Sequence, residues 1–256
     1  MGKTNGTVEL LNLEIRQWLA QQKFGDEPVI GLRFSPKGNL LVVQLSELMS
    51  GTLSSRLILW NPTTGETFGP FQNVSGAFAC APDETKLAAA TPSYEPQIWD
   101  IRTAKPVITL RSHTWDITAV SFSPDGKLLV TASIDNTLRL WDTASWSELA
   151  ILRGHMGGVR CAAFSGDGKT LVTGSADEAV KLWDVDTRQE LLSFSISPRD
   201  PYRIMLSPDK SALAIQTTIE GRRPADVLLL RAPTFAEIEE REKANAAARA
   251  LVKLDN

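Results

Sequence analysis

Residues 121–142, SFSPDGKLLVTASIDNTLRLWD, align without a gap with residues 163–184, AFSGDGKTLVTGSADEAVKLWD. A shift of 42 residues carries the first stretch onto the second, and it also carries His113 onto His155. Self-similarity at a period of about 20 to 50 residues is typical of repeat architectures. The chain is therefore predicted to be built from repeats of this length.

Weaker copies flank the central pair on both sides. One apolar anchor recurs in every copy, at Phe34, Cys80, Phe122, Phe164 and Leu206. The first and last copies carry insertions in the same loop, at residues 46–55 and 220–224. We therefore expect five repeats, over residues 14–62, 66–101, 105–143, 147–185 and 189–231.

Within a repeat, short alternating apolar runs are separated by turn residues. Residues 117–122 and 128–131 form two such runs around the turn Pro124-Asp125-Gly126, which is the pattern of a β-hairpin. Four short strands in each copy indicate a β-propeller blade, a small twisted sheet that buries both faces only by stacking on neighbours. The sequence thus predicts an all-β propeller of four-stranded antiparallel blades.

The central copies resemble the WD-repeat family of β-propellers, and the resemblance covers roughly residues 14–232. The residues that carry it are His113, Ser133, Asp135 and Trp141, and then His155, Ser175, Asp177 and Trp183. The resemblance implies that each set forms a hydrogen-bonded tetrad that fixes its blade. A neutral imidazole between a hydroxyl and a carboxylate would leave no buried polar atom unpaired. The other copies lack the histidine, so no tetrad is expected there.

The first residues align with the middle of a repeat, because residues 7–13 match residues 137–143. Residues 1–13 are therefore predicted to be a remnant strand of a preceding blade, so the propeller has about five repeats and a partial one. WD-repeat proteins most often have seven blades. Three hypotheses follow: the chain is part of a longer protein, a second copy completes its ring, or residues 16–22 pair with the last blade and close the ring.

The composition changes after Pro233. Thr234 and Glu237 have the spacing of a capping box, in which each side chain pairs with the backbone of the first helical turn. Residues 233–256 are thus predicted to form a C-terminal α-helix. Residues 230–238 are similar to the tail that follows the last blade in large bacterial WD-repeat proteins.

Composition narrows the class of partner. The chain has 27 Lys+Arg and 30 Asp+Glu, a formal net charge of −3, whereas nucleic-acid-binding domains are usually basic. It contains no apolar run of the roughly 18 residues that a membrane-spanning helix needs, and its first 20 residues hold no apolar signal core. We therefore expect no nucleic acid, no membrane and a cytoplasmic location.

Neither histidine is available as a catalytic base, because the repeat already uses both. The sequence contains no nucleophile elbow, P-loop, zinc-protease motif or dinucleotide fingerprint, and Cys80 and Cys161 lie too far apart in sequence to suggest a metal cluster. We expect no enzyme activity, no cofactor and no metal.

Binding is expected in the loops, because the strands are committed to packing. Trp115 and Asp116 follow His113 at the place where the next repeat has two glycines. Arg222 and Arg223 lie in the last insertion, and arginine pairs suit carboxylate or phosphate contacts. These four residues are the candidate partner-binding positions.

We interpret the chain as a non-catalytic scaffold for protein–protein interaction, within a larger bacterial signalling or sensor protein. One alternative is a self-assembling propeller whose partial ring is completed by a second copy, giving a homo-oligomer. Another is a propeller enzyme of the lyase or hydrolase type, which would need a titrating group that faces a polar channel.

Overall fold

The computed structural model describes residues 2–14, 16–49, 52–111, 113–196, 200–207, 212–218 and 226–231. Within these ranges the regular elements are 21 β-strands, which form six sheets in chain order. No stretch of these ranges forms a helix long and apolar enough to cross a membrane. The C-terminal helix predicted for residues 233–256 lies outside the described residues.

All strand pairs are antiparallel, and the strands have the following bounds. The first sheet pairs β1 (Thr7–Asn12) with β2 (Gln17–Lys23). The second contains β3 (Val29–Phe34), β4 (Leu41–Met49), β5 (Thr52–Trp60) and β6 (Thr67–Val74). The third contains β7 (Phe78–Cys80), β8 (Lys86–Ala89), β9 (Gln97–Asp100) and β10 (Pro106–Thr109). The fourth contains β11 (Ile117–Phe122), β12 (Leu128–Ser133), β13 (Thr137–Asp142) and β14 (Glu148–Arg153). The fifth contains β15 (Val159–Phe164), β16 (Thr170–Ser175), β17 (Ala179–Asp184) and β18 (Glu190–Ser195). The last contains β19 (Asp200–Leu206), β20 (Ala212–Thr218) and β21 (Val227–Arg231).

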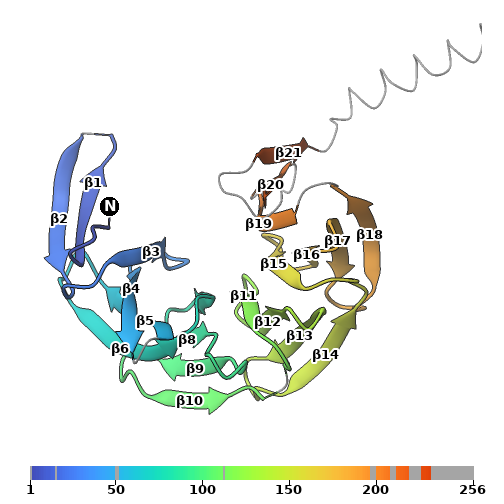
Figure 1. Ribbon diagram of the computed structural model, residues 1–256, viewed down its shortest axis with the longest axis horizontal. Coiled ribbons are helices and arrows are strands. Elements are labelled where there is room, and N and C mark those ends of the chain that lie inside the picture. The colour runs from blue at the N-terminus through green and yellow to red at the C-terminus, as the bar shows by residue number, and fades with distance from the viewer. Residues whose placement is uncertain are drawn as a thin grey trace, which may run out of the picture.

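The sheets follow one another around an open arc (Figure 1). Strands β3, β11, β15 and β19 line its inner side, and β2, β6, β10, β14 and β18 lie on its outer side. The chain enters each four-stranded sheet at its inner strand and leaves at its outer strand. The prediction of an all-β propeller with four-stranded antiparallel blades is confirmed. The partial repeat contributes β1 to the two-stranded first sheet, and the first full repeat contributes β2.

In the fourth and fifth sheets, the turn between the two inner strands is held by a serine, an aspartate and a glycine. In the β11–β12 turn, Ser123 Oγ donates to Asp125 Oδ1 at 2.6 Å and accepts the Leu128 backbone N–H at 2.9 Å. Gly126 has a φ of 74°, a left-handed conformation that glycine adopts without steric cost. Residues 165–168 repeat the arrangement in the next sheet. The turn chemistry therefore positions both hairpins in the same way.

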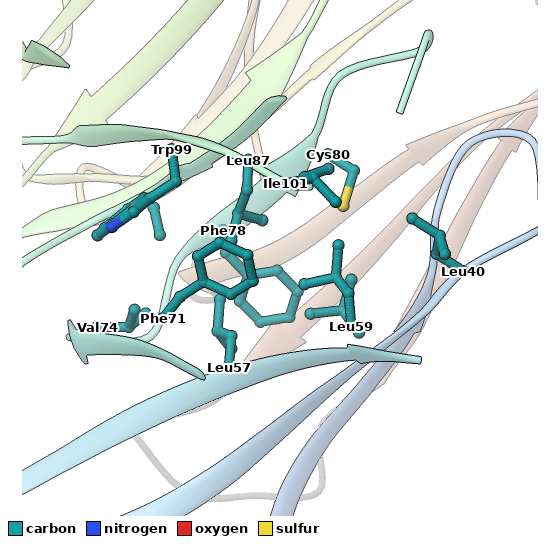
Figure 2. Packing of buried hydrophobic residues seen from close by; sticks show 12 residues of the cluster. Leu40, Leu57, Leu59, Phe71, Val74, Phe78, Cys80, Leu87, Trp99 and Ile101 are labelled. Atoms are coloured by element: carbon teal, nitrogen blue, oxygen red, sulfur yellow. The ribbon is translucent and has the colours of Figure 1, made fainter. Parts of the chain in front are cut away.

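The hydrophobic core consists of clusters between consecutive sheets. Figure 2 shows one of them, in which Leu57, Leu59 and Phe71 of the second sheet meet Phe78 and Trp99 of the third. Four similar clusters join the remaining neighbours. Burying one large apolar side chain contributes about 1.5–3 kcal/mol relative to exposure. Each of the four-stranded sheets is therefore stabilised by the sheets on both of its sides, as the repeat pattern predicts.

Residues 16–22 do not close the ring. Strand β2 pairs with β1, with Leu10 opposite Ala20. In the described part of the chain β2 has no pairing with the last sheet. Val8, Leu10 and Ala20 pack on the second sheet, and this burial directs the first two strands to that sheet. The ring-closure hypothesis is therefore wrong for this structure.

Candidate interaction surface

A buried hydrogen-bond network links the strands of the fourth sheet to the segment that precedes it. His113 lies between β10 and β11, and its imidazole is fully buried. Its Nδ1 lies 2.8 Å from Asp135 Oδ2 and its Nε2 lies 2.8 Å from Thr131 Oγ1. Trp141 Nε1 donates to the same Thr131 oxygen at 3.1 Å. The order is therefore tryptophan, threonine, histidine, aspartate.

The protonation states follow from burial and from the order of the network. Burial lowers the pKa of His113, although Asp135 acts in the opposite direction. Burial alone would raise the pKa of Asp135, but hydrogen bonds from Thr137, His113 and the Thr114 backbone hold it below its usual range. The aspartate is thus ionised and the imidazole neutral, so Nδ1–H donates to Asp135 and the Thr131 hydroxyl donates to Nε2. Every polar group then has a partner.

The fifth sheet repeats this network one period later. His155 Nδ1 lies 3.0 Å from Asp177 Oδ2, and its Nε2 lies 2.8 Å from Thr173 Oγ1. Trp183 Nε1 donates to Thr173 at 2.9 Å. Burial lowers the pKa of His155 as well. The structure thus brings the predicted histidines, aspartates and tryptophans together in both repeats.

The central hydroxyl, however, is not the predicted serine. Thr131 and Thr173 occupy that place, while Ser133 Oγ donates to the Trp115 carbonyl at 3.0 Å and Ser175 Oγ donates to the Gly157 carbonyl at 2.8 Å. Residues two apart on a strand share a face and are separated by about 6.8 Å, so one hydroxyl reaches the indole and the other reaches the loop. The threonines obey the same shift of 42 residues, but that signal did not distinguish the two hydroxyls.

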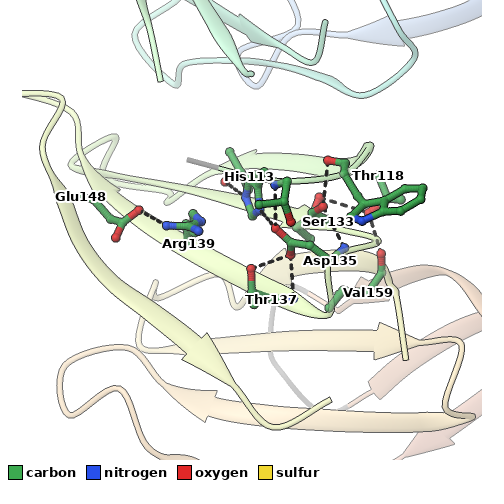
Figure 3. Close-up of polar contacts among 12 residues, drawn as sticks. His113, Thr118, Ser133, Asp135, Thr137, Arg139, Glu148 and Val159 are labelled. Atoms are coloured by element: carbon green, nitrogen blue, oxygen red, sulfur yellow. Dashed lines mark hydrogen bonds and ion pairs between the residues drawn. The ribbon is translucent and has the colours of Figure 1, made fainter. Parts of the chain in front are cut away.

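The two serines and aspartates fix the loops that follow the histidines. Figure 3 shows His113, Ser133 and Asp135 gathered at one end of the fourth sheet. Asp135 Oδ2 accepts the Thr114 backbone N–H at 3.2 Å, and the Asp116 carbonyl accepts the Ile134 backbone N–H at 3.0 Å. The backbone on both sides of Trp115 is therefore held.

Three large apolar side chains project from this fixed backbone. Trp115 is 59% exposed, Ile134 is 37% exposed and Met156 is 87% exposed. Ile134 lies against Gly158, where an added Cβ would come within 3.1 Å of the Ile134 Cα. Met156 donates its backbone N–H to Asp177 at 2.7 Å. We call Trp115, Ile134 and Met156 the rim patch; it extends across two sheets.

Besides Trp115, the sequence analysis named Asp116, Arg222 and Arg223 as candidate partner-binding residues. Asp116 is exposed beside Trp115. Arg222 and Arg223 lie outside the described residues. Ile134 and Met156 were missed by the sequence analysis, although Met156 directly follows a repeat histidine.

Within the part of the chain that the structure describes, the side chains give no indication of a metal centre or a reactive thiol. Over the described ranges, no three His, Cys, Asp or Glu side chains come together in a group that could bind a metal. Cys80 and Cys161 are buried and form no disulfide. Burial raises the pKa of each thiol to about 12, and such protonated, enclosed thiols are poor nucleophiles.

Comparison with known proteins places the repeats in a family. The family model described as "WD domain, G-beta repeat" matches residues 104–142 and 146–184, the same stretches that hold the two networks. These two stretches are thus WD repeats, and the match supports the WD-repeat β-propeller family. Propellers of this family generally bind protein partners and act as non-catalytic scaffolds. No curated protein matches the sequence.

Solved structures support the same fold. The crystal structure of the C-terminal WD40 domain of Sif2 matches with a TM-score of 0.71 and 22% sequence identity. The match covers 89% of this chain and 61% of that chain. This WD-repeat chain therefore spans about three-fifths of the length of the structure that it matches. The Sif2 domain is one of 1557 solved chains that match, so the fold assignment does not depend on one structure.

Proposed function

We propose that this WD-repeat propeller is a protein-interaction scaffold that binds its partner through the rim patch. The observation that carries the proposal is the pairing of exposed apolar side chains with a fixed backbone. Trp115, with 59% of its surface exposed, belongs to a residue type that is enriched at interface hot spots. Its loop is held by Ser133 and Asp135.

Preorganisation of the loops favours binding at this surface. Binding to a loop that is already ordered avoids about 0.5–1.5 kcal/mol for each side chain that would otherwise be immobilised. The two histidine networks order neighbouring loops in the same way. A partner that spans the fourth and fifth sheets thus meets a surface whose parts are held in fixed relative positions.

We further propose that this chain acts without catalysis, in the cytoplasm, as part of a larger bacterial signalling or sensor protein. Both nitrogens of His113 and of His155 are engaged in hydrogen bonds, which favours a structural role. The buried cysteines without a disulfide suit a reducing compartment. The partial coverage of the matched chain supports a longer protein.

To test the proposal, peptides that bind the unaltered chain are selected from a random displayed library. Their affinities are then measured for the unaltered chain, for a rim-patch variant and for a control variant. The rim-patch variant carries Trp115→Ala and Met156→Ala, and the control carries Leu191→Ala, a side chain that is 58% exposed on the outer strand β18. We expect most selected peptides to lose at least about tenfold in affinity for the rim-patch variant, as a hot-spot residue predicts, and to bind the control unchanged. Peptides that bind all three proteins equally would show that the rim patch is not the binding surface.

A further inference from the structure

The inner strands of four sheets carry a β-bulge at the same place. In each bulge two residues of the inner strand oppose one residue of the second strand, and the extra residue is Ile30 in β3, Thr118 in β11, Arg160 in β15 and Tyr202 in β19. A bulge redirects the side chain of the extra residue and is frequent beside functional sites. Of these four residues only Arg160 carries a charge, and it is exposed.

Hydrogen bonds from two neighbouring strands hold the backbone that leads into Arg160. Thr118 Oγ1 donates to the Val159 carbonyl at 2.6 Å, which joins β11 of the fourth sheet to β15 of the fifth (Figure 3). The Ala176 backbone N–H, at the end of β16, donates to the Gly158 carbonyl at 2.9 Å. The backbone position of Arg160 is therefore fixed, as it is for Trp115.

Arg160 lies at the edge of the rim patch. Three residues separate it from Met156, and one of them is Gly158, the residue that lies against Ile134. Tryptophan, methionine and arginine are residue types that are enriched at protein interfaces, and the rim patch together with Arg160 contains all three. The apolar surface around Trp115 thus has a positive charge on its fifth-sheet side.

The charge of Arg160 is not used within the described part of the chain, where it forms no ion pair or hydrogen bond. Other cations of the same two sheets do form ion pairs. Arg139 pairs with Glu148 at 2.5 Å in the fourth sheet, and Lys181 pairs with Glu190 at 2.8 Å in the fifth. The guanidinium of Arg160 is therefore available to an anionic group of a ligand.

We propose that the rim patch binds a segment of a partner polypeptide in which an acidic side chain pairs with Arg160 and neighbouring apolar side chains cover Trp115 and Met156. This inference rests on the proposed function of the rim patch and adds the chemistry of the partner. A guanidinium can bind a carboxylate through two parallel hydrogen bonds. Asp116 is exposed on the fourth-sheet side of the patch and would repel a carboxylate there, so the acidic residue of the partner lies over the fifth sheet.

A polypeptide fits this surface better than a nucleic acid does. The chain has a formal net charge of −3, whereas surfaces that bind a phosphate backbone contain clustered lysines and arginines. Here Arg160 and Asp116 flank an apolar patch, so a continuous row of phosphates would meet a negative charge as well as a positive one. A single carboxylate beside apolar side chains meets only the arginine.

The probes for the test are peptides from two displayed random libraries with the same apolar residues. One library has Asp and Glu as its only charged residues, and the other has Lys and Arg. Both are selected on the unaltered chain, and affinities are then measured for two charge-reversal variants. Arg160→Glu alters the proposed site, whereas Arg188→Glu alters an exposed arginine in the β17–β18 turn, at the other end of the fifth sheet.

We expect the acidic library to supply the binders. Their affinity should fall at least about tenfold for Arg160→Glu, because a charge pair inside an interface is replaced by two like charges, and should be unchanged for Arg188→Glu. Exchanging the acidic residue of a peptide for lysine should restore binding to Arg160→Glu. Arg160→Gln, which removes the charge without reversing it, should also weaken binding, and unfolding midpoints establish that each variant is folded.

Binders from the basic library alone, or acidic peptides that bind both Arg160 variants as tightly as the unaltered chain, would overturn the proposal. So would a single-stranded oligonucleotide that binds more tightly than any selected peptide and is lost in Arg160→Glu. The rim-patch variant separates this inference from the proposed function. Acidic peptides that lose affinity for the rim-patch variant but not for Arg160→Glu would overturn the inference alone, whereas peptides that keep their affinity for both would contradict both.

Discussion

At the scale of single residues, Thr131 and Thr173 join each indole to each imidazole. Both side chains are fully buried, and each oxygen receives the tryptophan N–H while its own proton reaches the histidine. Removing this one oxygen leaves two buried groups without partners. A buried donor or acceptor that loses its partner costs about 1–3 kcal/mol.

We predict that Thr131→Val, which keeps the shape and removes the hydroxyl, lowers the free energy of unfolding by at least about 1–3 kcal/mol. Ser145→Ala, which removes an exposed turn hydroxyl, should change it far less. Urea denaturation of the two variants measures the difference. Equal stabilities would show that Thr131 is not the centre of the network.

The histidines and aspartates of the two networks make the stability of the fold depend on pH. Folding lowers the pKa of His113 and His155 through burial, so the unfolded chain binds more protons near the ordinary histidine pKa of about 6.5. The stabilisation is complete above that pH and is lost as pH falls below it. The lowered pKa values of Asp135 and Asp177 add a further loss at lower pH, when these carboxylates become protonated.

We therefore predict that the urea midpoint is constant above about pH 7 and falls between about pH 6.5 and pH 5. Replacing both histidines by glutamine should flatten that part of the profile. A midpoint that stays constant down to about pH 5 in the unaltered chain would contradict the assignment of neutral, buried imidazoles.

At the scale of strands, the second sheet keeps the tryptophan of the repeat but not its acceptor. Trp60 Nε1 is buried and, within the described residues, has no hydrogen-bond partner. By register, Val43 of β4 takes the place of Thr131, because it lies opposite Ile58 as Thr131 lies opposite Arg139. The rings of Trp60 and Phe24 pack in a T-shaped arrangement. The Trp60 side chain is therefore held by apolar packing and not by a hydrogen bond to β4.

We predict that Val43→Thr is tolerated, because the new hydroxyl can accept the Trp60 N–H. Val42→Thr is the matched control: it is equally buried, but it faces the apolar cluster with the third sheet. Burying a hydroxyl without a partner costs about 1–3 kcal/mol in proteins, and we expect Val43→Thr to cost about 1 kcal/mol less than Val42→Thr. Thermal or urea unfolding measures the loss of stability in each variant. Equal losses would show that a hydroxyl at residue 43 does not accept the Trp60 N–H.

The sequence predicted the strands better than the contacts between side chains. Alternation and turn residues identified the hairpin of residues 117–131 because a β-strand has a period of two and Gly126 marks the turn. The repeat identified His113, Asp135 and Trp141. It could not separate Thr131 from Ser133, since both lie on one face of β12, nor could it decide where residues 16–22 pair, since that depends on packing between sheets.

At the scale of the whole molecule, stability is distributed along the arc by neighbours. The fourth and fifth sheets are covered on both faces and contain the two networks. Among the described residues, the first and last sheets each have one neighbour in the arc. In repeat proteins, stability is approximately a sum of terms within repeats and terms between nearest neighbours.

We predict that hydrogen exchange is slowest in β12 and β16 and fastest in β1 and β21, because opening from either end breaks one junction instead of two. Mass spectrometry of exchanged peptides measures this order. Uniform protection from β1 to β21 would mean that the arc opens as one cooperative unit.

The position of the histidines also bears on mechanical resistance. Each matched repeat begins with the outer strand of one sheet and continues into the inner strands of the next, so His113 and His155 lie in the covalent crossings from β10 to β11 and from β14 to β15. Each imidazole binds an aspartate and a threonine of the sheet that follows. A force that pulls an outer strand away from its sheet would therefore have to break the hydrogen bonds of the histidine before it could separate the next inner hairpin. The crossings from β2 to β3 and from β6 to β7 have no such histidine, so a pulled molecule would be expected to separate at one of these two crossings before it separates at the crossings that contain His113 and His155.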